Sequence, residues 1–535
     1  MADLDSGLTD SELVQAVQTT AHQRIKRGTD YLVADGVTDD TVALQALLSM
    51  GGNIDLRGMD IAIASNILIV ANVDTRVQAE GGRIKKAGAT RVRNLIEIDH
   101  TVSSFSMFGG EIDGSDTANV GIQVSCDHAF NGCHIHNFST VVADNTSCIG
   151  IKPYRWTEAA VMNDSFHSVV ENCHIHDIYG ETNNTLADEQ GSSRAIRASM
   201  SYQQHGSTFS YRNNHIHDIY GEEGDGIEAT YSDGSADDVP TKQARVDASD
   251  STLVITGNRI YDCTRRALKI KMIHMTVSDN PMLQLYTAGD PEEAEGTTAA
   301  VVACWSNVTD VIMQKVVLTN NNIINNLNAL TAPLSVMNVK EVVIANNPSI
   351  KNTTAQQKTA ILLGGTVNDV SIYDNELEGD GAVSWDSDCI IGKCNFINNR
   401  VKLRSDLFTT PAFIDGATGT CDSFVVDGNV LYAGMDNTEA LLNVRYAGVH
   451  DFFGEFIASN NKFLRDAGGI SPCILAKFYV LYENVVAGEE YKFLNNYSNG
   501  DGSDMFFVYT GADATATVRF GNVKNSAESD ALSDQ

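Results

Sequence analysis

The apolar residues of this chain recur at alternate positions in short runs, and turn-forming residues separate the runs. Leu253 and Ile255, for example, are followed by Gly-Asn and then by Ile260. Such a period of two, bounded by Gly, Asn and Asp, predicts short strands joined by turns. Four segments share nearly one pattern, which indicates a repeat: 132–138 (GCHIHNF), 172–178 (NCHIHDI), 213–219 (NNHIHDI) and 257–263 (GNRIYDC).

Later copies of the repeat keep an Asn at the turn, and the intervals from Asn258 onward range from 22 to 42 residues. Coils of about 22–30 residues, with inserted loops or one missed coil, explain these intervals. An Asn tolerates a left-handed backbone and can hydrogen-bond neighbouring main chain, so turns stacked at about 4.8 Å would form a ladder. We expect Cys133 and Cys173 to fill this position in earlier coils. The predicted fold is all-β, a right-handed parallel β-helix (solenoid), with these later ladder residues: Asn280, Asn322, Asn347, Asn375, Asn399, Asn429, Asn461 and Asn496.

Residues 31–48 predict a short helical cap for the open end of the solenoid, whose strand edges need cover. Thr38 or Asp39 would begin a helix with Val42, Leu44, Ala46 and Leu47 as its apolar residues, and a strand would follow at 52–57. The block 34–48 (ADGVTDDTVALQALL) resembles the opening signature of the pectate-lyase-like β-helix superfamily, which recurs in bacteriophage tailspikes and in capsule or O-antigen depolymerases. The resemblance implies a homotrimeric phage tailspike that binds and cleaves a bacterial surface polysaccharide.

The chain divides, by prediction, into an N-terminal attachment segment (1–27), a helix-capped start (28–58), the β-helix (59–500) and a C-terminal segment with an acidic tail (501–535). An amphipathic helix at 9–18 could join the first segment to a virion tail or adaptor protein. The N-terminus has no basic and apolar run typical of a signal peptide, and no later stretch is apolar enough to span a membrane. We therefore expect synthesis in the host cytoplasm, location in the virion and no membrane insertion.

The net charge of −32 makes nucleic acid and anionic membranes unfavourable partners, because a polyanion would be repelled over most of the surface. The ten cysteines are scattered without metal-type spacing, so we interpret them as small buried residues. No metal or other cofactor is expected for a hydrolase.

Three later strands can be registered against one another, at 193–198, 224–229 and 265–270. With Ile196, Ile227 and Leu268 pointing inward, Arg197, Glu228 and Lys269 would point outward. Arg194, Asp225 and Arg266 form a parallel column with the same order of charges. These columns are either charge ladders on a solvated face or part of a glycan cleft, walled by inserts near 182–192 and 232–250.

Glycoside hydrolysis needs two carboxyl groups, one protonated and one ionised. Glu222, Glu223, Asp225 and Glu228 lie within seven residues, and one pKa is expected to rise in a crowded group of carboxylates. We predict these four residues as catalytic. The substrate-binding side chains would include the charged columns, Trp305 as an aromatic platform, and Glu181, Asp188 and Asp233, any of which could supply the second carboxyl group.

Three other functions remain open. A lyase acting by β-elimination on a uronate-containing glycan would use Arg197, Lys269 and Arg266, with calcium held by Asp225 and Glu228. A mannuronan-type epimerase would share this chemistry without cleavage, and a fibre of the same fold would bind glycan only. The two histidine columns, His134, His174 and His215 beside His136, His176 and His217, we interpret as side-chain ladders, and tryptophans 156, 305 and 385 as buried unless they stack on sugar.

Overall fold

In the computed structural model the chain forms two compact units, Met1–Glu222 and Glu223–Gln535. Residues 1–24 of the predicted attachment segment lie outside the part that the structure describes, and the predicted segment boundaries stay predictions. The described residues are 25–70, 73–141, 146–154, 165–180, 192–200, 205–221, 223–231, 238–285, 300–305, 311–326, 332–353, 359–385, 389–403, 414–416, 420–433, 442–445, 453–465, 474–479, 490–498, 505–510, 517–520, 523–524, 527–528 and 533–534.

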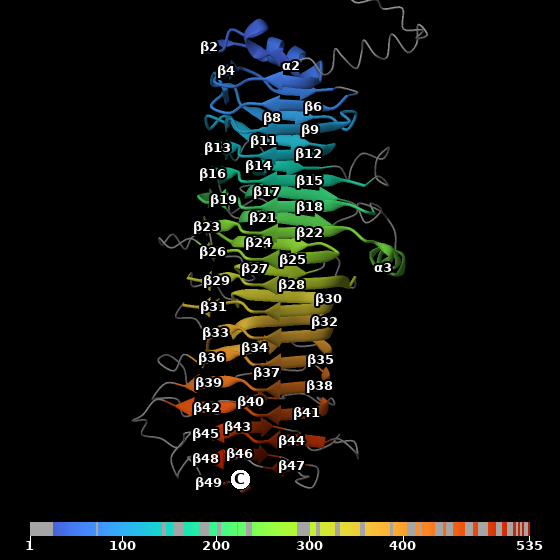
Figure 1. Ribbon diagram of the computed structural model, residues 1–535, viewed down its shortest axis with the longest axis vertical. Coiled ribbons are helices and arrows are strands. Elements are labelled where there is room, and N and C mark those ends of the chain that lie inside the picture. The colour runs from blue at the N-terminus through green and yellow to red at the C-terminus, as the bar shows by residue number, and fades with distance from the viewer. Residues whose placement is uncertain are drawn as a thin grey trace, which may run out of the picture. The chain divides into compact units, whose positions relative to one another are not determined.

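In the first unit the strands of successive coils stack into three ladders of parallel strands, and a coil contributes a separate strand to each ladder (Figure 1). Ladder 1 contains β5 (Ile67–Ile69), β8 (Val92–Ile98), β11 (Ala118–Val124), β14 (Cys148–Pro153) and β17 (Ser193–Met200). Ladder 2 contains β1 (Lys26–Arg27), β3 (Gly52–Asp55), β6 (Thr75–Gln78), β9 (Ser104–Phe108), β12 (Asp127–Asn131), β15 (His167–Glu171) and β18 (Thr208–Arg212). Ladder 3 contains β2 (Asp35–Asp39), β4 (Asp60–Ile63), β7 (Arg83–Lys86), β10 (Glu111–Asp113), β13 (His134–Thr140), β16 (His174–Gly180), β19 (His215–Ile216) and β20 (Ile219–Tyr220).

The second unit has the same three-ladder plan, and two long strands, β30 (Leu334–Ala345) and β32 (Thr359–Tyr373), belong to both ladder 1 and ladder 2. The rest of ladder 1 is β21 (Gly224–Tyr231), β24 (Arg266–Lys271), β27 (Val302–Trp305), β34 (Gly381–Trp385), β37 (Ile414–Gly416), β40 (Leu442–Arg445), β43 (Ile474–Tyr479), β46 (Met505–Thr510) and β50 (Ser533–Asp534). The rest of ladder 2 is β22 (Thr252–Thr256), β25 (His274–Ser278), β28 (Met313–Thr319), β35 (Ile390–Ile397), β38 (Thr420–Asp427), β41 (Phe453–Ser459), β44 (Glu490–Leu494) and β47 (Thr517–Phe520).

Ladder 3 of the second unit is β23 (Arg259–Cys263), β26 (Met282–Leu285), β29 (Asn322–Asn325), β31 (Ser349–Asn352), β33 (Glu376–Gly379), β36 (Arg400–Leu403), β39 (Val430–Ala433), β42 (Lys462–Arg465), β45 (Tyr497–Ser498) and β48 (Val523–Lys524). The short β49 (Ala527–Glu528) pairs antiparallel with β48, whereas the other pairings between described strands are parallel. The predicted fold class, an all-β parallel β-helix with a short helical segment near its start, is confirmed.

Inward side chains stack in columns because successive coils pair in register. One column of isoleucines runs through ladder 3 of the first unit, and each member is at least 96% buried. Burying one such side chain contributes about 1.5–3 kcal/mol, so the core gains stability at every added coil. The members are Ile61, Ile84, Ile112, Ile135, Ile175 and Ile216.

The predicted asparagine ladder runs through the second unit from Asn258 to Asn496. Each buried amide accepts the main-chain N–H of the previous Asn in the ladder, for example Asn321 N–H to Asn347 Oδ1 at 2.9 Å. One prediction was wrong by one residue, because Asn321 and not Asn322 occupies the ladder and bonds both Asn280 and Asn347. The direct Asn280–Asn321 bond also shows that the longest interval contains an inserted segment rather than a missed coil.

The left-handed backbone and the ladder hydrogen bonds belong to different residues, contrary to the sequence interpretation. Asn346, directly before ladder residue Asn347, has φ 54°, and Asn398 before Asn399 has φ 55°. In the first unit the corresponding position is filled as predicted by Cys133 and Cys173, and the Cys173 N–H donates to Asn214 Oδ1 at 2.9 Å. The nine cysteines in the described residues are buried and form no disulfide bonds with one another, and Cys473 lies outside that part of the chain.

The N-cap of the helical segment near the start lies one residue after Asp39 and two residues after Thr38, the two residues predicted for it. Helix α2 (Thr41–Ser49) has Asp40 as its N-cap, while Asp39 accepts the Thr41 N–H at 3.0 Å. The helix buries its leucines, yet Val42 is 83% exposed, so the predicted apolar face was wrong in part. A second helix, α3 (Val239–Ala248), occupies part of the insert predicted to wall a cleft. Neither of these two helices of the described residues is long and apolar enough to cross a membrane.

Candidate functional site

Ladder 1 of the second unit brings the predicted acidic residues next to cations of the following coil. Strands β21 and β24 pair in parallel with Asp225 opposite Arg266 and Glu228 opposite Lys269. Lys269 in turn pairs with Ala303 of β27, the strand that ends at Trp305. The two charged columns therefore follow the register predicted from the sequence within this unit.

Both columns meet on one side of the strand because two consecutive residues point inward between them. A side chain at Gly226 would lie 2.4 Å from Ile260 Cγ2 and 3.3 Å from Cys263 Sγ, both in the core, and Ile227 is also completely buried. Ala267 and Leu268 on β24 are equally buried. A strict alternation would place Asp225 and Glu228 on opposite faces. The sequence -Asp-Gly-Ile-Glu- instead lets the two carboxylates share one face.

Three carboxylates converge on the ammonium group of Lys269. Its Nζ lies 3.2 Å from Glu228 Oε1, 3.3 Å from Glu223 Oε2 and 3.8 Å from Asp225 Oδ2. Arg265 Nη1 pairs with Glu223 Oε1 at 2.7 Å, and Arg266 Nη1 pairs with Asp225 Oδ1 at 3.3 Å. We call Glu223, Asp225, Glu228, Arg265, Arg266 and Lys269 the Lys269 cluster.

Most of the Lys269 cluster is buried, which differs from a charge ladder on a solvated face, one of the two interpretations of these columns from the sequence. The side chain of Asp225 is 0% exposed and that of Glu228 is 4% exposed, whereas Glu223 retains 27%. Because a buried charge needs a partner, these ion pairs hold β21 against β24. Glu223 is the carboxylate of the cluster that a ligand in solvent would meet first.

The separation of the carboxyl groups is compatible with glycoside hydrolysis. Glu228 Oε1 and Glu223 Oε2 lie 3.2 and 3.3 Å from Lys269 Nζ. The distance between these two oxygens is therefore at most 6.5 Å. Carboxyl pairs of glycosidases are about 5–9.5 Å apart. The raised carboxyl pKa was expected from the acidic residues alone. In the structure, the three carboxylates pair with three cations, Arg265, Arg266 and Lys269.

A tryptophan and a second lysine border the cluster. The Arg266 guanidinium lies 5.4 Å from the centre of the Trp305 ring, and Lys271 Nζ lies 4.9 Å from it. Burial, followed by repulsion from Lys269, lowers the pKa of Lys271 to about 8. Lys271 was not predicted from the sequence, although Lys271 follows Lys269 on the same face of β24 and lies opposite Thr230.

Two of the other predicted site residues lie on one strand of the first unit. Arg194 and Arg197 belong to β17 of the first unit, where both guanidinium groups donate to Ser147 Oγ, at 3.1 and 3.4 Å. Trp385 is buried in the second unit. Glu181, Asp188, Glu222, Asp233 and Trp156 lie outside the described residues.

The carboxylates predicted to hold calcium in a lyase already bind a cation of the protein, because Asp225 and Glu228 both pair with Lys269. Within the described residues, the groups whose spacing could hold a metal ion lie on ladder 3 of the first unit and consist mainly of histidines.

No family model matches the sequence, and no curated protein matches it. Among solved structures, a mutant tailspike protein of E. coli bacteriophage HK620 in complex with a pentasaccharide is 12% identical with a TM-score of 0.45, covering 98% of this chain and 82% of that one. The Dettilon tailspike protein is 11% identical with a TM-score of 0.41, covering 84% and 68%. The A-module of the Azotobacter vinelandii mannuronan C-5 epimerase AlgE6 is 10% identical with a TM-score of 0.31, covering 93% and 98%. Similarity of fold at this level does not establish a shared reaction.

Proposed function

We propose that this chain binds and cleaves a bacterial surface polysaccharide, a capsule or O-antigen, by carboxylate-catalysed glycoside hydrolysis. The observation that carries the proposal is the convergence of Glu223, Asp225 and Glu228 on Lys269, beside the ring of Trp305. The charged groups can hydrogen-bond the hydroxyls of a sugar, and the indole ring can stack on its apolar face. The bacterial source of the glycan follows from the resemblance of residues 34–48 to tailspikes.

Glu223 takes the central role in this proposal because it is the most exposed of the three carboxylates. Its partner is Glu228, whose Oε1 also contacts the Lys269 ammonium and lies at most 6.5 Å from Glu223 Oε2. Lys269, Arg265 and Arg266 would position these carboxylates. Trp305 would stack on a sugar ring.

Incubation with purified capsule or O-antigen, followed by size analysis and a reducing-end assay, tests this function. Glu223→Gln and Glu228→Gln keep the side-chain volume but cannot ionise, so we expect loss of cleavage by a factor of about 100 or more with binding retained. Glu341→Gln is the control, because Glu341 forms an exposed ion pair with Lys315 on ladder 2. Full cleavage by both site variants would place catalysis elsewhere, and binding without cleavage by the unaltered chain would leave a glycan-binding fibre.

Elimination on a uronate-containing glycan is the second candidate, and Lys271 is the observation that favours it. A lysine whose pKa is lowered to about 8 can lose its proton near neutral pH and act as the base. Lys269 and Arg266 would neutralise the uronate carboxylate, and calcium, if used, would have to replace Lys269 at Asp225 and Glu228. The same arrangement would serve an epimerase that returns the proton without cleavage.

The pH dependence of the rate separates the two mechanisms. The neutral amine is the active form of a basic lysine, so the rate of elimination should rise as the pH passes through about 8. Lys271→Arg stays protonated and should remove this increase. Products with the ultraviolet absorbance of an unsaturated uronate would mark elimination, and new reducing ends without that absorbance would mark hydrolysis.

Assembly as a homotrimer on a phage tail, joined through residues 1–27 to a tail or adaptor protein, remains part of the proposal. Sedimentation of the full chain and of a chain lacking residues 1–27 would test it. We expect trimers in both cases, and binding to tail proteins in the first case alone. If the active site lies between subunits, a monomeric variant would lose cleavage while keeping its fold.

A further inference from the structure

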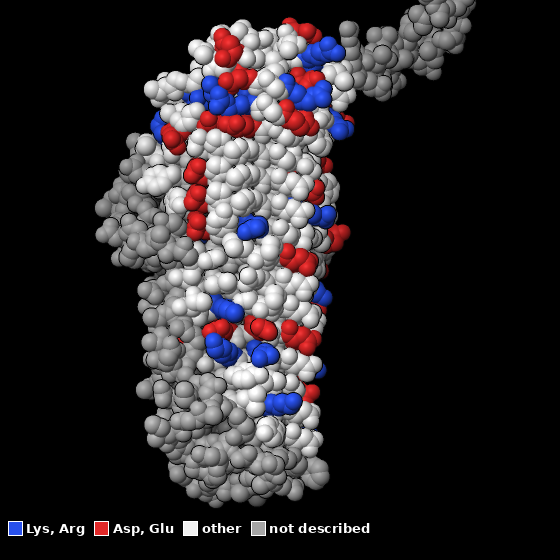
Figure 2. Space-filling model, turned by 60° about the vertical axis from the view of Figure 1, so that its left-hand side comes forward, with Lys and Arg blue, Asp and Glu red and all other residues white. Residues whose placement is uncertain are grey.

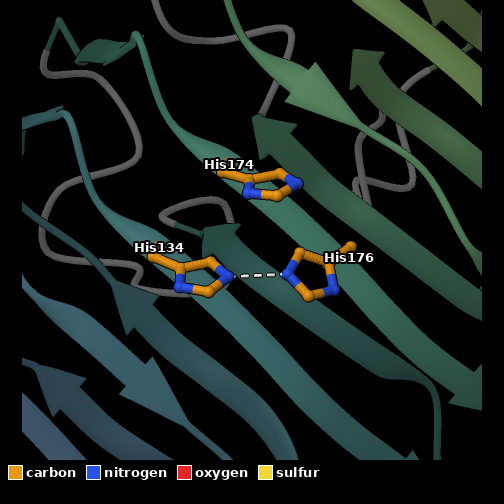
Figure 3. Close-up of side chains that lie close together, drawn as sticks. All are labelled: His134, His174 and His176. Atoms are coloured by element: carbon orange, nitrogen blue, oxygen red, sulfur yellow. Dashed lines mark hydrogen bonds between the residues drawn. The ribbon is translucent and has the colours of Figure 1, made fainter.

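Ladder 3 of the first unit carries two columns of stacked imidazole rings. Strands β13 and β16 align His134 with His174 and His136 with His176, and β19 continues the first column with His215. The rings of His134 and His174 are 5.0 Å apart and inclined by 11°, and those of His176 and His217 are 4.9 Å apart and inclined by 4°. Figure 3 shows His134, His174 and His176 arranged around one another on neighbouring strands.

The two columns are joined by diagonal hydrogen bonds that each connect one coil with the next. His134 Nε2 lies 2.6 Å from His176 Nε2 (Figure 3), and His174 Nε2 lies 2.7 Å from His217 Nε2. In the preceding coil the same diagonal joins Glu111 Oε1 to His136 Nε2 at 3.1 Å. The nitrogens of successive coils therefore face one another in a regular series.

Carboxylates fix which nitrogen of the second column carries the lone pair. His176 Nδ1 lies 2.7 Å from Asp177 Oδ2, and His217 Nδ1 lies 2.8 Å from Asp218 Oδ2. An Nδ1–H that donates to a carboxylate leaves Nε2 as an acceptor, and metal-binding histidines are oriented by this kind of contact. In both residues the Nε2 lone pair consequently points at another imidazole.

We propose that this histidine ladder binds a divalent ion of the zinc class. Its ligands are imidazole nitrogens from two neighbouring coils, joined in one group by the Glu111 carboxylate. Three groups have ligand atoms within 4.8 Å of one another: His134, His174 and His176; His174, His215 and His217; and Glu111, His134 and His136. Zinc binds nitrogen at about 2.0–2.1 Å, so two ligands of a tetrahedral ion are about 3.3 Å apart. The 2.6 Å pair has to widen by less than about 1 Å, which rotation of the side chains can supply.

The chemistry of the ladder selects the ion. Imidazole favours zinc, copper, nickel and cobalt over calcium and magnesium, which prefer oxygen ligands. Figure 2 shows charged side chains gathered over β4, β7 and β10, and a mostly uncharged face next to them.

Shared residues limit the stoichiometry. His134 belongs to the first and third groups, and His174 belongs to the first and second. If each imidazole binds one ion, at most two ions can bind at once, at the disjoint groups around His215 and around Glu111. This count distinguishes the ladder from scattered surface histidines.

The experiment measures binding of Zn²⁺ and Co²⁺ to the full chain without an affinity tag, by calorimetry and by the visible absorption of bound Co²⁺. We expect up to two ions per chain, no displacement by excess Ca²⁺ and a rise in melting temperature. His174→Ala should leave one ion, at Glu111, His134 and His136, and His134→Ala should leave one at His174, His215 and His217. The double variant should leave none.

His167→Ala is the control, because His167 is partly exposed on ladder 2 and bonds Thr208 Oγ1. A second double variant, His134→Gln with His174→Gln, keeps larger polar side chains in case the alanine double variant does not fold. Far-ultraviolet circular dichroism should show the β-helix in every variant. Absence of binding by the unaltered chain would overturn the proposal, and so would two ions bound to a folded double variant. Because the readout is metal binding, failure here leaves the proposed polysaccharide cleavage unaffected.

Discussion

Replacing Asn347 by alanine tests the role of the asparagine ladder in the second unit. Its side chain makes four hydrogen bonds in a fully buried position. Nδ2 donates to Leu318 O at 3.0 Å and to Asn375 Oδ1 at 2.8 Å, while Oδ1 accepts the main-chain N–H of Asn321 at 2.9 Å and its Nδ2 at 3.2 Å. The substitution removes all four at once.

The cost follows from the groups left behind. Two buried donors of Asn321 lose their acceptor, each at about 1–3 kcal/mol, and the Leu318 carbonyl loses a donor. We expect Asn347→Ala to lower the free energy of unfolding by about 3–5 kcal/mol. Asn347→Asp should cost at least as much, because a carboxylate would face Leu318 O and Asn375 Oδ1 and could not donate to either.

Urea denaturation followed by circular dichroism measures the change. Asn346→Gly is the matched control, since Asn346 is the exposed left-handed residue of the same turn and glycine adopts φ 54° without strain. We expect the control to stay within about 0.5 kcal/mol. A loss of under about 1 kcal/mol in Asn347→Ala, or an equal loss in the control, would refute the hydrogen-bond account of the ladder.

Three further predictions concern packing and charge. Gly226→Ala should lower stability by about 1–3 kcal/mol and impair cleavage, because its Cβ would lie 2.4 Å from Ile260 Cγ2 and 2.7 Å from the Ala267 carbonyl oxygen; an unchanged melting temperature would contradict this. Lys269→Met should cost about 3–5 kcal/mol by urea denaturation, because it leaves buried carboxylates with fewer cations, whereas Lys315→Met in an exposed pair should cost little. Burial lowers the pKa of His128 to about 4, so the unfolded chain, with a His pKa of about 6.5, binds the proton first as the pH falls. Stability present above pH 6.5 should therefore decrease by about 3 kcal/mol between pH 6.5 and 4, and His128→Gln should reduce this loss in urea titrations at the two pH values.

The sequence determined the repeat and its strands because the turn chemistry is local. The residues Gly, Asn and Asp mark turns wherever they occur, and alternating apolar residues mark strands, so the ladder positions of Asn258, Asn280 and Asn347 could be predicted. Asn322 was predicted in place of Asn321 because three asparagines, 320–322, are adjacent there, and the choice depends on which amide meets Asn280 and Asn347. The separation of the left-handed residue from the ladder residue was likewise visible only in the backbone.

The charged columns were predicted only in part from the sequence, and the rest depends on the tertiary structure. Register alone predicted that Asp225 faces Arg266 and Glu228 faces Lys269. It did not predict that the inward pair Gly226 and Ile227 would turn both acids toward one ammonium, or that the group would be buried and charge-balanced. The register also did not predict the diagonal hydrogen bonds between the two histidine columns. The period of a coil comes from residues close in sequence, whereas the meeting of side chains from different coils depends on how each coil bends and stacks.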